Sequence, residues 1–265
     1  MQAQLVAIVT GGTSGIGRET ARYLSSAGCR VYAFSRRGAG ENYARHMRVD
    51  VSDESQVREA VEEIFQREGR IDILVNNAGF GISGAFEFTR DADARRLMDV
   101  NLFGMNNTIR AVLPHMRAAG RGRIVNMSSV AAPLPIPFQA WYSISKAAVN
   151  ALTMALANEV KPYGVSVCCV MPGDIHTGFT AARQKSLDGD EAYGGRIARS
   201  VARMERDEVN GMSPERAGRF VGRLALKKRV KPYNAIGLTY KGCVLLSKIL
   251  PGPLIRYILG KMYAQ

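Results

Sequence analysis

The sequence predicts an α/β fold, a single Rossmann-like domain with a doubly wound parallel sheet and helices on both faces. Short apolar runs rich in Val and Ile alternate with amphipathic stretches, and strands separated by helices favour right-handed crossovers and a parallel sheet. A glycine-rich turn between the first run and the first helical stretch is the second observation. The expected strands are Leu5–Thr10, Arg30–Ser35, His46–Val49, Ile71–Val75, Arg123–Met127, Val165–Met171 and Asn234–Leu238. The expected helices lie near Gly15–Ala27, Glu54–Glu68, Ala92–Ala118, Gln139–Pro162 and Pro214–Lys227.

Length and composition indicate one domain over residues 1–265. Hydrophobic residues make up 46% of the chain and charged residues 22%, which is typical of a globular protein. We find no internal repeat and no linker. No apolar run reaches the roughly 20 residues that cross a bilayer, and the start of the chain lacks the features of a signal peptide. We therefore expect a cytoplasmic protein.

The net charge of +13 is concentrated near the C-terminus. Glu215 is the last acidic residue, and eleven basic residues follow it. The preceding part is therefore close to neutral, which argues against a nucleic-acid partner.

The segment between residues 10 and 17 has the pattern of a phosphate-binding turn. Gly11 is suited to the tight turn that leaves the strand, Gly15 to a close approach of backbone to a pyrophosphate, and Gly17 to tight packing of the helix. The free N–H groups and the dipole at the helix start favour phosphate. The sequence therefore predicts a dinucleotide site that includes Thr13, Ser14 and Ile16.

The end of the second expected strand predicts which dinucleotide binds. NAD sites usually place a carboxylate there to hold the ribose 2′-hydroxyl, whereas this chain has Ser35, Arg36 and Arg37. Guanidinium groups suit a phosphate, and Thr13 and Ser14 close the other side. We therefore expect NADP(H).

A Tyr and a Lys four residues apart predict acid/base chemistry. Tyr142 and Lys146 share one helix face, and an ammonium group beside a phenol stabilises the phenolate. Bringing a Tyr pKa from about 10 to neutrality requires about 4 kcal/mol, which Lys146 and an oxidised nicotinamide are expected to supply together. Ser129 is the expected donor to the substrate oxygen, with Ser128 as its rival.

With these motifs in hand, the chain resembles the short-chain dehydrogenase/reductase family, closely over residues 5 to about 180. The motifs that carry the resemblance are Thr10–Gly17, Asp50, Asn76–Gly79, Asn101, Ser129, Tyr142 with Lys146, and Pro172-Gly173. The spacing of thirteen positions from Ser129 to Tyr142 favours Ser129 over Ser128.

The resemblance implies a role for each motif. Tyr142 exchanges a proton with the substrate oxygen, Lys146 also binds the nicotinamide ribose, and Asn101 holds a water that links Lys146 to solvent. The remaining cofactor contacts that it implies are Asp50 and Val51 at the adenine, Asn77, Ala78 and Gly79 in the middle, and Pro172, Gly173, Ile175 and Thr177 at the nicotinamide. It also implies a homodimer or homotetramer built through two long central helices. The mechanism needs no metal ion.

The expected substrate is a small hydrophobic ketone or secondary alcohol. Besides Ser129, the residues expected around it are mostly apolar: Phe80, Ile82, Phe138, Gln139 and Phe179. The motifs look most like those of hydroxysteroid and retinol dehydrogenases. A 3-oxoacyl-thioester reductase is the first alternative, although such enzymes generally end soon after their last strand. An inactive NADPH-binding sensor or scaffold is the second.

Two segments fall outside the regular alternation. Residues 177–213 are polar and glycine-rich, and a stretch this long inside one domain predicts a lid over the substrate. Residues 240–265 form an apolar tail with spaced basic residues. Packing of this tail on its own domain or a partner subunit, as part of the substrate wall, is the favoured interpretation. Contact with an anionic membrane surface is the alternative.

Overall fold

The structure, a computed structural model, describes residues 4–38 and 42–264. The prediction about a signal peptide concerns a start of the chain that lies partly outside these residues. No helix within the described ranges is long and apolar enough to cross a membrane.

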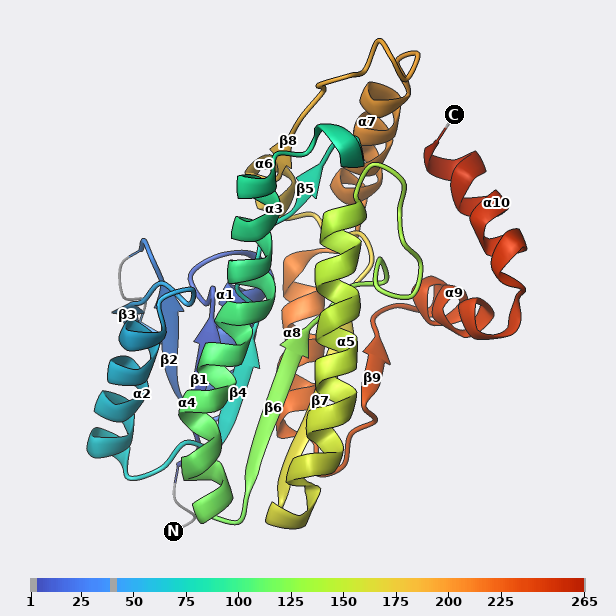
Figure 1. Ribbon diagram of the computed structural model, residues 1–265. Coiled ribbons are helices and arrows are strands. Elements are labelled where there is room, and N and C mark those ends of the chain that lie inside the picture. The colour runs from blue at the N-terminus through green and yellow to red at the C-terminus, as the bar shows by residue number, and fades with distance from the viewer. Residues whose placement is uncertain (1–3, 39–41, 265) are drawn as a thin grey trace.

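One parallel sheet of seven strands forms the centre of the molecule, in the order β3-β2-β1-β4-β6-β7-β9 (Figure 1). This confirms the predicted fold class. The strands are β1 (Val6–Thr10), β2 (Arg30–Ser35), β3 (Arg45–Arg48), β4 (Ile73–Asn76), β6 (Gly122–Met127), β7 (Val165–Met171) and β9 (Tyr233–Ala235). Each lies within about two residues of its predicted range, except that β9 ends three residues early. A small second sheet pairs β5 (Ile82–Ser83) with β8 (Gln184–Lys185).

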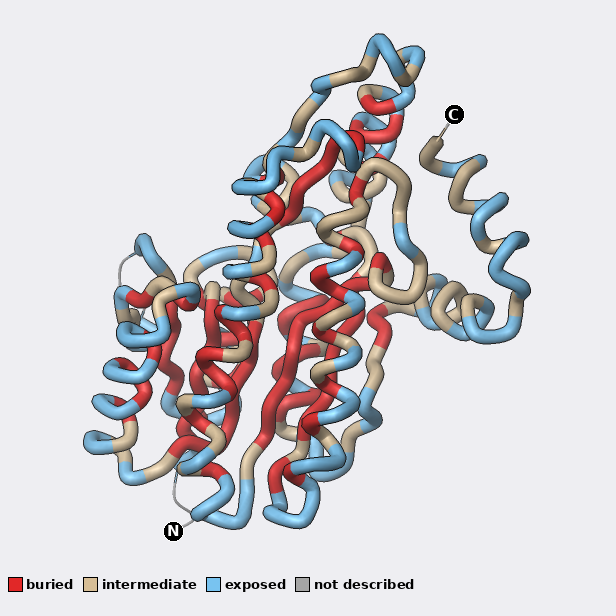
Figure 2. The backbone as a smooth tube through the Cα atoms, in the orientation of Figure 1, coloured by how far each residue is buried: buried red, intermediate tan, exposed pale blue. Residues whose placement is uncertain are grey.

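Helices cover both faces of the sheet because strand side chains alternate between two apolar clusters. One cluster holds Ile8 and Ile124 together with residues of α2 (Glu54–Glu68), α4 (Gly104–Ala118) and α5 (Ala140–Val160). The other holds Val9 and Val125 with residues of α1 (Gly15–Ser26) and α8 (Pro214–Leu226). Figure 2 shows these strands as the most buried part of the chain.

The predicted helix near Ala92–Ala118 is interrupted. It consists of α3 (Asp91–Met98), a π-helical segment η2 (Asp99–Phe103) and α4. Such π segments are rare and often lie at functional sites. Asn101, one of the predicted site residues, lies inside this one. Two short 3₁₀ helices lie elsewhere in the chain: η1 (Phe86–Phe88) precedes α3, and η3 (Lys161–Tyr163) follows α5.

Both segments outside the alternation contain helices, which the sequence did not predict. Residues 177–213 contain α6 (Phe179–Ala182), β8 and α7 (Arg196–Val209), and the tail contains α9 (Leu238–Ile249) and α10 (Gly252–Tyr263). In Figure 1, α10 stands beside α7, away from the sheet.

Candidate active site

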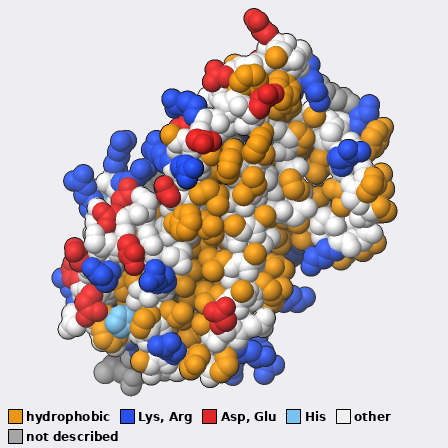
Figure 3. Space-filling model, viewed as in Figure 1, with side chains coloured by type: hydrophobic (Ala, Val, Ile, Leu, Met, Phe, Trp, Pro, Cys, Tyr) orange, Lys and Arg blue, Asp and Glu red, His pale blue; other side chains and the backbone are white. Residues whose placement is uncertain are grey.

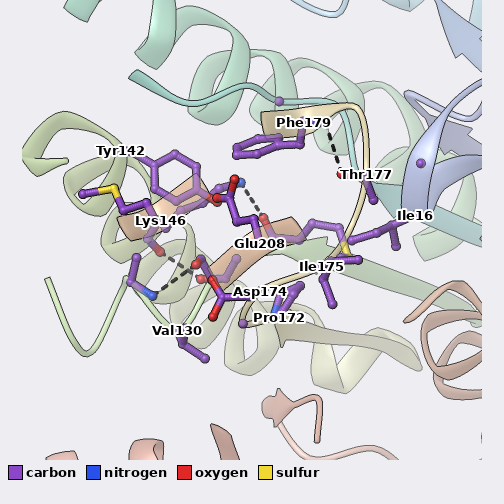
Figure 4. Close-up of a pocket in the computed structure, with 18 of the residues that line it drawn as sticks. Ile16, Val130, Tyr142, Lys146, Pro172, Asp174, Ile175, Thr177, Phe179 and Glu208 are labelled. Atoms are coloured by element: carbon purple, nitrogen blue, oxygen red, sulfur yellow. Dashed lines mark hydrogen bonds between the residues drawn. The ribbon is translucent and has the colours of Figure 1, made fainter. Parts of the chain in front are cut away.

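A cavity of about 390 Å³ opens at the carboxyl ends of the central strands. In a parallel sheet these ends meet at one edge, beside the N-terminus of α1. Figure 4 shows side chains from α5, the segment after β7 and α7 surrounding this cavity. The predicted cofactor residues that line it are Ser14, Gly15, Ile16, Asn77, Gly79, Tyr142, Lys146, Pro172, Gly173, Ile175 and Thr177.

The glycine turn has the geometry that its sequence predicts. Gly11 adopts a φ of +62°, which favours glycine, and its N–H donates to the Phe34 carbonyl at 2.7 Å. A Cβ on Gly17 would lie 2.2 Å from the Gly11 carbonyl oxygen. Gly17 therefore packs against the turn itself. Ser14 caps α1 without a side-chain hydrogen bond to any described residue, so the first amides of the helix face the cavity uncapped.

Asn77 fastens the end of β4 to this turn. Its side chain donates to the Thr10 carbonyl at 3.0 Å, and the backbone N–H groups of Asn77 and Ala78 both donate to the Thr10 hydroxyl at 2.9 Å. Ala78, predicted beside the cofactor, is not among the residues that line the cavity. The role of Asn77 is therefore in part to hold the glycine turn.

The residues expected at the adenine end lie outside the cavity. Arg36 and Arg37 are exposed at the end of β2, and Arg36 Nη1 is 4.0 Å from Asp50 Oδ2. The Ser35 hydroxyl donates to the Arg37 carbonyl, and Thr13 lies against Gly38. Val51 is buried against Gly104 of α4, so its side chain is not free to face a ligand.

Tyr142 and Lys146 project from α5 into the cavity (Figure 4). Ser129, in the loop after β6, also lines it. Lys146 Nζ donates to the Met127 carbonyl at 2.9 Å and lies 5.6 Å from the centre of the Tyr142 ring. Ser129 acts on Tyr142 by lowering the pKa of its phenol. The rival Ser128 donates instead to the Lys146 carbonyl at 3.1 Å, which leaves Ser129 as the hydroxyl beside Tyr142.

The lowering of the Tyr142 pKa that Lys146 and an oxidised nicotinamide are expected to supply together stays a prediction; without the cofactor the pKa of Tyr142 is raised. Burial raises the pKa of Tyr142 to about 12, the hydrogen bond from Ser129 opposes this, and the carboxylate of Glu208 adds to it. Burial also lowers the pKa of Lys146 to about 8. At neutral pH the phenol of Tyr142 therefore keeps its proton, and Lys146, with a pKa of about 8, still carries its charge.

Asn101 holds the backbone next to the cavity. Its side chain exchanges two hydrogen bonds of 3.0 Å with the N–H and carbonyl of Phe80, and it donates to Ser145 at 3.2 Å. A Cβ on Gly79 would lie 2.9 Å from Asn101 Oδ1 and 3.7 Å from Lys146 Nζ, so the amide and the ammonium group are close neighbours. Asn101 itself does not line the cavity.

The predicted substrate residues divide into two groups. Gln139 and Phe179 line the cavity, and the Phe179 ring lies 5.8 Å from that of Tyr142. Phe80, Ile82 and Phe138 do not line it. Arg96 covers the Phe80 ring at 5.7 Å, and Ile82 is buried in the β5–β8 pair.

Phe138 is turned away by its backbone. It has a φ of +60°, and its ring packs edge-on against Tyr193 at 5.6 Å. Its carbonyl accepts a hydrogen bond from Gly84 at 2.8 Å. A positive φ in a bulky residue is unusual and is not visible in the sequence, which explains why this prediction failed.

The predicted lid, residues 177–213, supplies cavity residues that sequence reasoning missed. Glu208 and Met204 reach the cavity from α7. The Glu208 carboxylate forms an ion pair with buried Arg183 and accepts a hydrogen bond from Thr180 at 2.6 Å. The segment therefore lies over the cavity, and its movement stays a prediction.

The tail forms part of the cavity wall, in agreement with the favoured interpretation. The Tyr240 hydroxyl donates to Asp174 Oδ2 at 2.5 Å and accepts from the Asp174 N–H at 3.0 Å. Tyr263 lines the cavity and donates to Asp207 at 3.3 Å. The sequence signal for these contacts was the presence of three Tyr residues in the tail.

Comparison with known proteins identifies the family. Residues 5–188 match the family described as short chain dehydrogenase. The chain belongs to the short-chain dehydrogenase/reductase family. It is 40% identical to the 3-ketodihydrosphingosine reductase of Bacteroides thetaiotaomicron, over 100% of this chain and 99% of that protein. It is also 33% identical to dehydrogenase/reductase SDR family member 7B of Xenopus tropicalis, over 93% of this chain and 82% of that protein.

Solved structures of the same family share the fold. A short-chain dehydrogenase from Streptomyces avermitilis has a TM-score of 0.83 and 29% identity, over 98% of this chain and 96% of its own. ElxO, solved with NADP bound, has a TM-score of 0.74 and 25% identity over 90% of this chain and 99% of its own. A Brucella melitensis 3-ketoacyl-(acyl-carrier-protein) reductase, solved with NADH, also has a TM-score of 0.74 and 25% identity, over 88% of this chain and 96% of its own. The chain is therefore an oxidoreductase of the type that interconverts alcohols and carbonyl compounds.

Proposed function

We propose that this protein reduces the ketone of a hydrophobic, long-chain substrate with NADPH. The observation that carries the proposal is the convergence of Tyr142, Lys146 and Ser129 on one cavity that also has an apolar wall. Full-length similarity to a 3-ketodihydrosphingosine reductase supports a long-chain 3-ketone over a steroid as the first substrate to test.

Ser129 and Tyr142 have different roles at the carbonyl group of the substrate. A bound nicotinamide dinucleotide supplies the hydride that the carbonyl carbon accepts. Ser129 donates a hydrogen bond to the carbonyl oxygen and stabilises the negative charge that develops there. Tyr142 then delivers its phenolic proton to that oxygen. Its raised pKa keeps this proton on the phenol at neutral pH, which suits reduction.

Lys146 and Asn101 support this proton transfer. Lys146 lies against the Tyr142 ring, and its charge stabilises the phenolate left after the proton is delivered. Asn101 fixes the Phe80 backbone beside Lys146, next to the path along which a water would return a proton. In alcohol oxidation the same groups act in the opposite direction.

Preference for NADP(H) rests on the end of β2. Arg36 and Arg37 are exposed beside the glycine turn, with Thr13 next to Gly38 across the gap. No carboxylate ends β2 itself, and two guanidinium groups there suit a 2′-phosphate. The carboxylate of Asp50 faces Arg36, and we expect it to contact the adenine ring rather than the ribose.

The substrate side of the cavity is bounded by Val130, Ile136, Ala182, Met204 and Phe179. Such a lining favours an alkyl chain by removing its surface from water. Lid and tail residues lie on this side too, so a long chain would pass between them.

A self-association surface is part of the proposal. Figure 3 shows hydrophobic side chains gathered over α4 and α5, and Phe103, Ile144 and Met154 in this region are 54%, 43% and 39% exposed. Exposed apolar side chains that cluster on two long helices are suited to an isologous contact. We expect a homodimer or homotetramer, measured as native mass in solution.

The deciding experiment is a substrate panel followed by NADPH absorbance. The panel holds a long-chain 3-ketone, a steroid ketone, a retinoid and a 3-oxoacyl thioester. The proposal expects the long-chain ketone to give the highest kcat/KM and NADPH to exceed NADH. Preference for the thioester would favour the alternative reductase, and no turnover of any compound would favour a nucleotide-binding sensor.

A further inference from the structure

The tail helices α9 and α10 combine positive charge with exposed apolar surface. Residues 238–264 contain four basic residues and no acidic one. Leu238 is 86% exposed, and Ile249 and Tyr257 are more than 60% exposed. Within α10, all of whose residues are described, none is buried. A soluble protein rarely leaves so much aliphatic surface in water unless something covers it.

This exposed surface belongs to a segment that is held in place at both ends. Tyr240 at the start of α9 is hydrogen-bonded to Asp174, and Tyr263 at the end of α10 is hydrogen-bonded to Asp207. Arg196 Nε donates to the Ala264 carbonyl at 2.7 Å. The fold therefore fixes the two ends against the body and presents the apolar side chains between them outward.

A cationic groove adjoins the most exposed apolar residue. This second cavity, of about 560 Å³, lies between α8 and α9 and includes Leu238 in its wall. Its basic lining residues are Arg216, Arg219, Arg223 and Lys241, against the single acid Glu215. Figure 3 shows further basic side chains beside the orange surface of α10. The exposed Leu238 of α9 therefore borders a cluster of basic side chains.

We propose that α9, α10 and the groove dock on the surface of an anionic lipid bilayer. The apolar side chains enter the boundary between headgroups and acyl chains, and the basic side chains contact lipid phosphates. A second copy of the chain is a poorer partner because its tail would bring the same positive charges and no acidic residue to pair with them.

Docking here would place the cavity close to the bilayer. Tyr263 of α10 lines the cavity, so the tail lies between the lipid surface and the reacting groups. A hydrophobic substrate would then pass from the bilayer along the tail. This last step rests on the proposed function, whereas docking itself does not.

Vesicle flotation of the full-length protein tests the proposal without turnover. The vesicles contain phosphatidylcholine alone or phosphatidylcholine and phosphatidylglycerol in equal parts. We expect flotation with the anionic vesicles, weakening as salt is raised. The double variant Leu245→Glu, Ile249→Glu should bind at least about tenfold more weakly, because it removes two apolar anchors and adds negative charge.

A control variant separates this effect from a general change in charge. Tyr163→Glu alters a side chain that is 49% exposed in η3, outside the tail, and should float like the original protein. All three proteins should reduce a water-soluble short-chain ketone at the same rate. Equal rates show that each variant is folded. They also separate a loss of membrane docking from a loss of the proposed reaction. Equal flotation of the tail variant, or a tail-dependent change in native mass without vesicle binding, would overturn the proposal.

Discussion

Lys146 Nζ lies 5.6 Å from the centre of the Tyr142 ring, one turn further along α5. Burial shifts the pKa values of these two groups in opposite directions, to about 12 for Tyr142 and about 8 for Lys146. Both shifts favour the uncharged form. A phenol that keeps its proton at neutral pH is in the form that ketone reduction requires.

Replacing Tyr142 by Phe should abolish reduction and leave cofactor binding intact. The variant removes only the hydroxyl, and general acid catalysis of this kind contributes about 10²- to 10⁴-fold to the rate. Steady-state reduction and NADPH fluorescence titration would measure the two effects. Tyr163→Phe, on the exposed η3 turn, is the matched control. Residual activity above about a tenth of the original would rule out Tyr142 as the proton donor.

Replacing Lys146 by Met should stabilise the fold while impairing catalysis. Because the folded pKa of about 8 lies below the ordinary value of 10.5, the unfolded chain binds more protons between these limits and the stability of the original protein rises with pH there. Below about pH 8 the lysine is charged in both states and the full desolvation cost applies. We expect a gain of about 1–3 kcal/mol near pH 7 that shrinks near pH 10.

Urea unfolding of both proteins at these two pH values measures the difference. Lys161→Met, on an exposed lysine, is the control and should change stability by less than about 0.5 kcal/mol at either pH. A loss of stability in Lys146→Met near pH 7 would mean that the hydrogen bond to Met127 outweighs the desolvation of the ammonium group.

Replacing Arg36 by Asp should reverse the cofactor preference. The change removes a guanidinium group from the end of β2 and places a second carboxylate near Asp50, which repels a 2′-phosphate. We expect KM for NADPH to rise at least tenfold, as loss of a charge-assisted hydrogen bond implies, with a smaller change for NADH. Arg48→Asp, on an exposed residue of β3, controls for net charge. Equal effects on the two cofactors would contradict the assignment.

The sheet and its helices were predictable because their apolar residues repeat with the period of each element. Ile8 and Val9 are adjacent in β1 and enter different clusters, as alternation requires. The order of motifs along the chain also placed Ser129 and Tyr142 together, although 13 positions separate them, because the loop after β6 and the start of α5 lie at the same sheet edge.

The missed elements had weaker or misleading signals. Ile197, Val201 and Met204 have the spacing of one helix face, and this pattern predicts α7, but abundant Arg and nearby Gly favoured a loop. Glu208 reaches Tyr142 only through the tertiary placement of α7 over the cavity. The strained Phe138 conformation depends on contacts with Gly84 and Tyr193, which no local pattern contains.

Replacing Glu208 by Gln tests whether the lid adjusts the acidity of Tyr142. The carboxylate of Glu208 raises the pKa of Tyr142, so the neutral amide should lower that pKa and increase the fraction of phenolate at a given pH. The pH profile of kcat/KM for alcohol oxidation, which needs the phenolate, should then shift toward lower pH. Glu205→Gln, on the same helix but paired with Lys185, should leave the profile in place. An unchanged profile in Glu208→Gln would show that the ion pair with Arg183 already cancels the effect of the Glu208 carboxylate on the pKa of Tyr142.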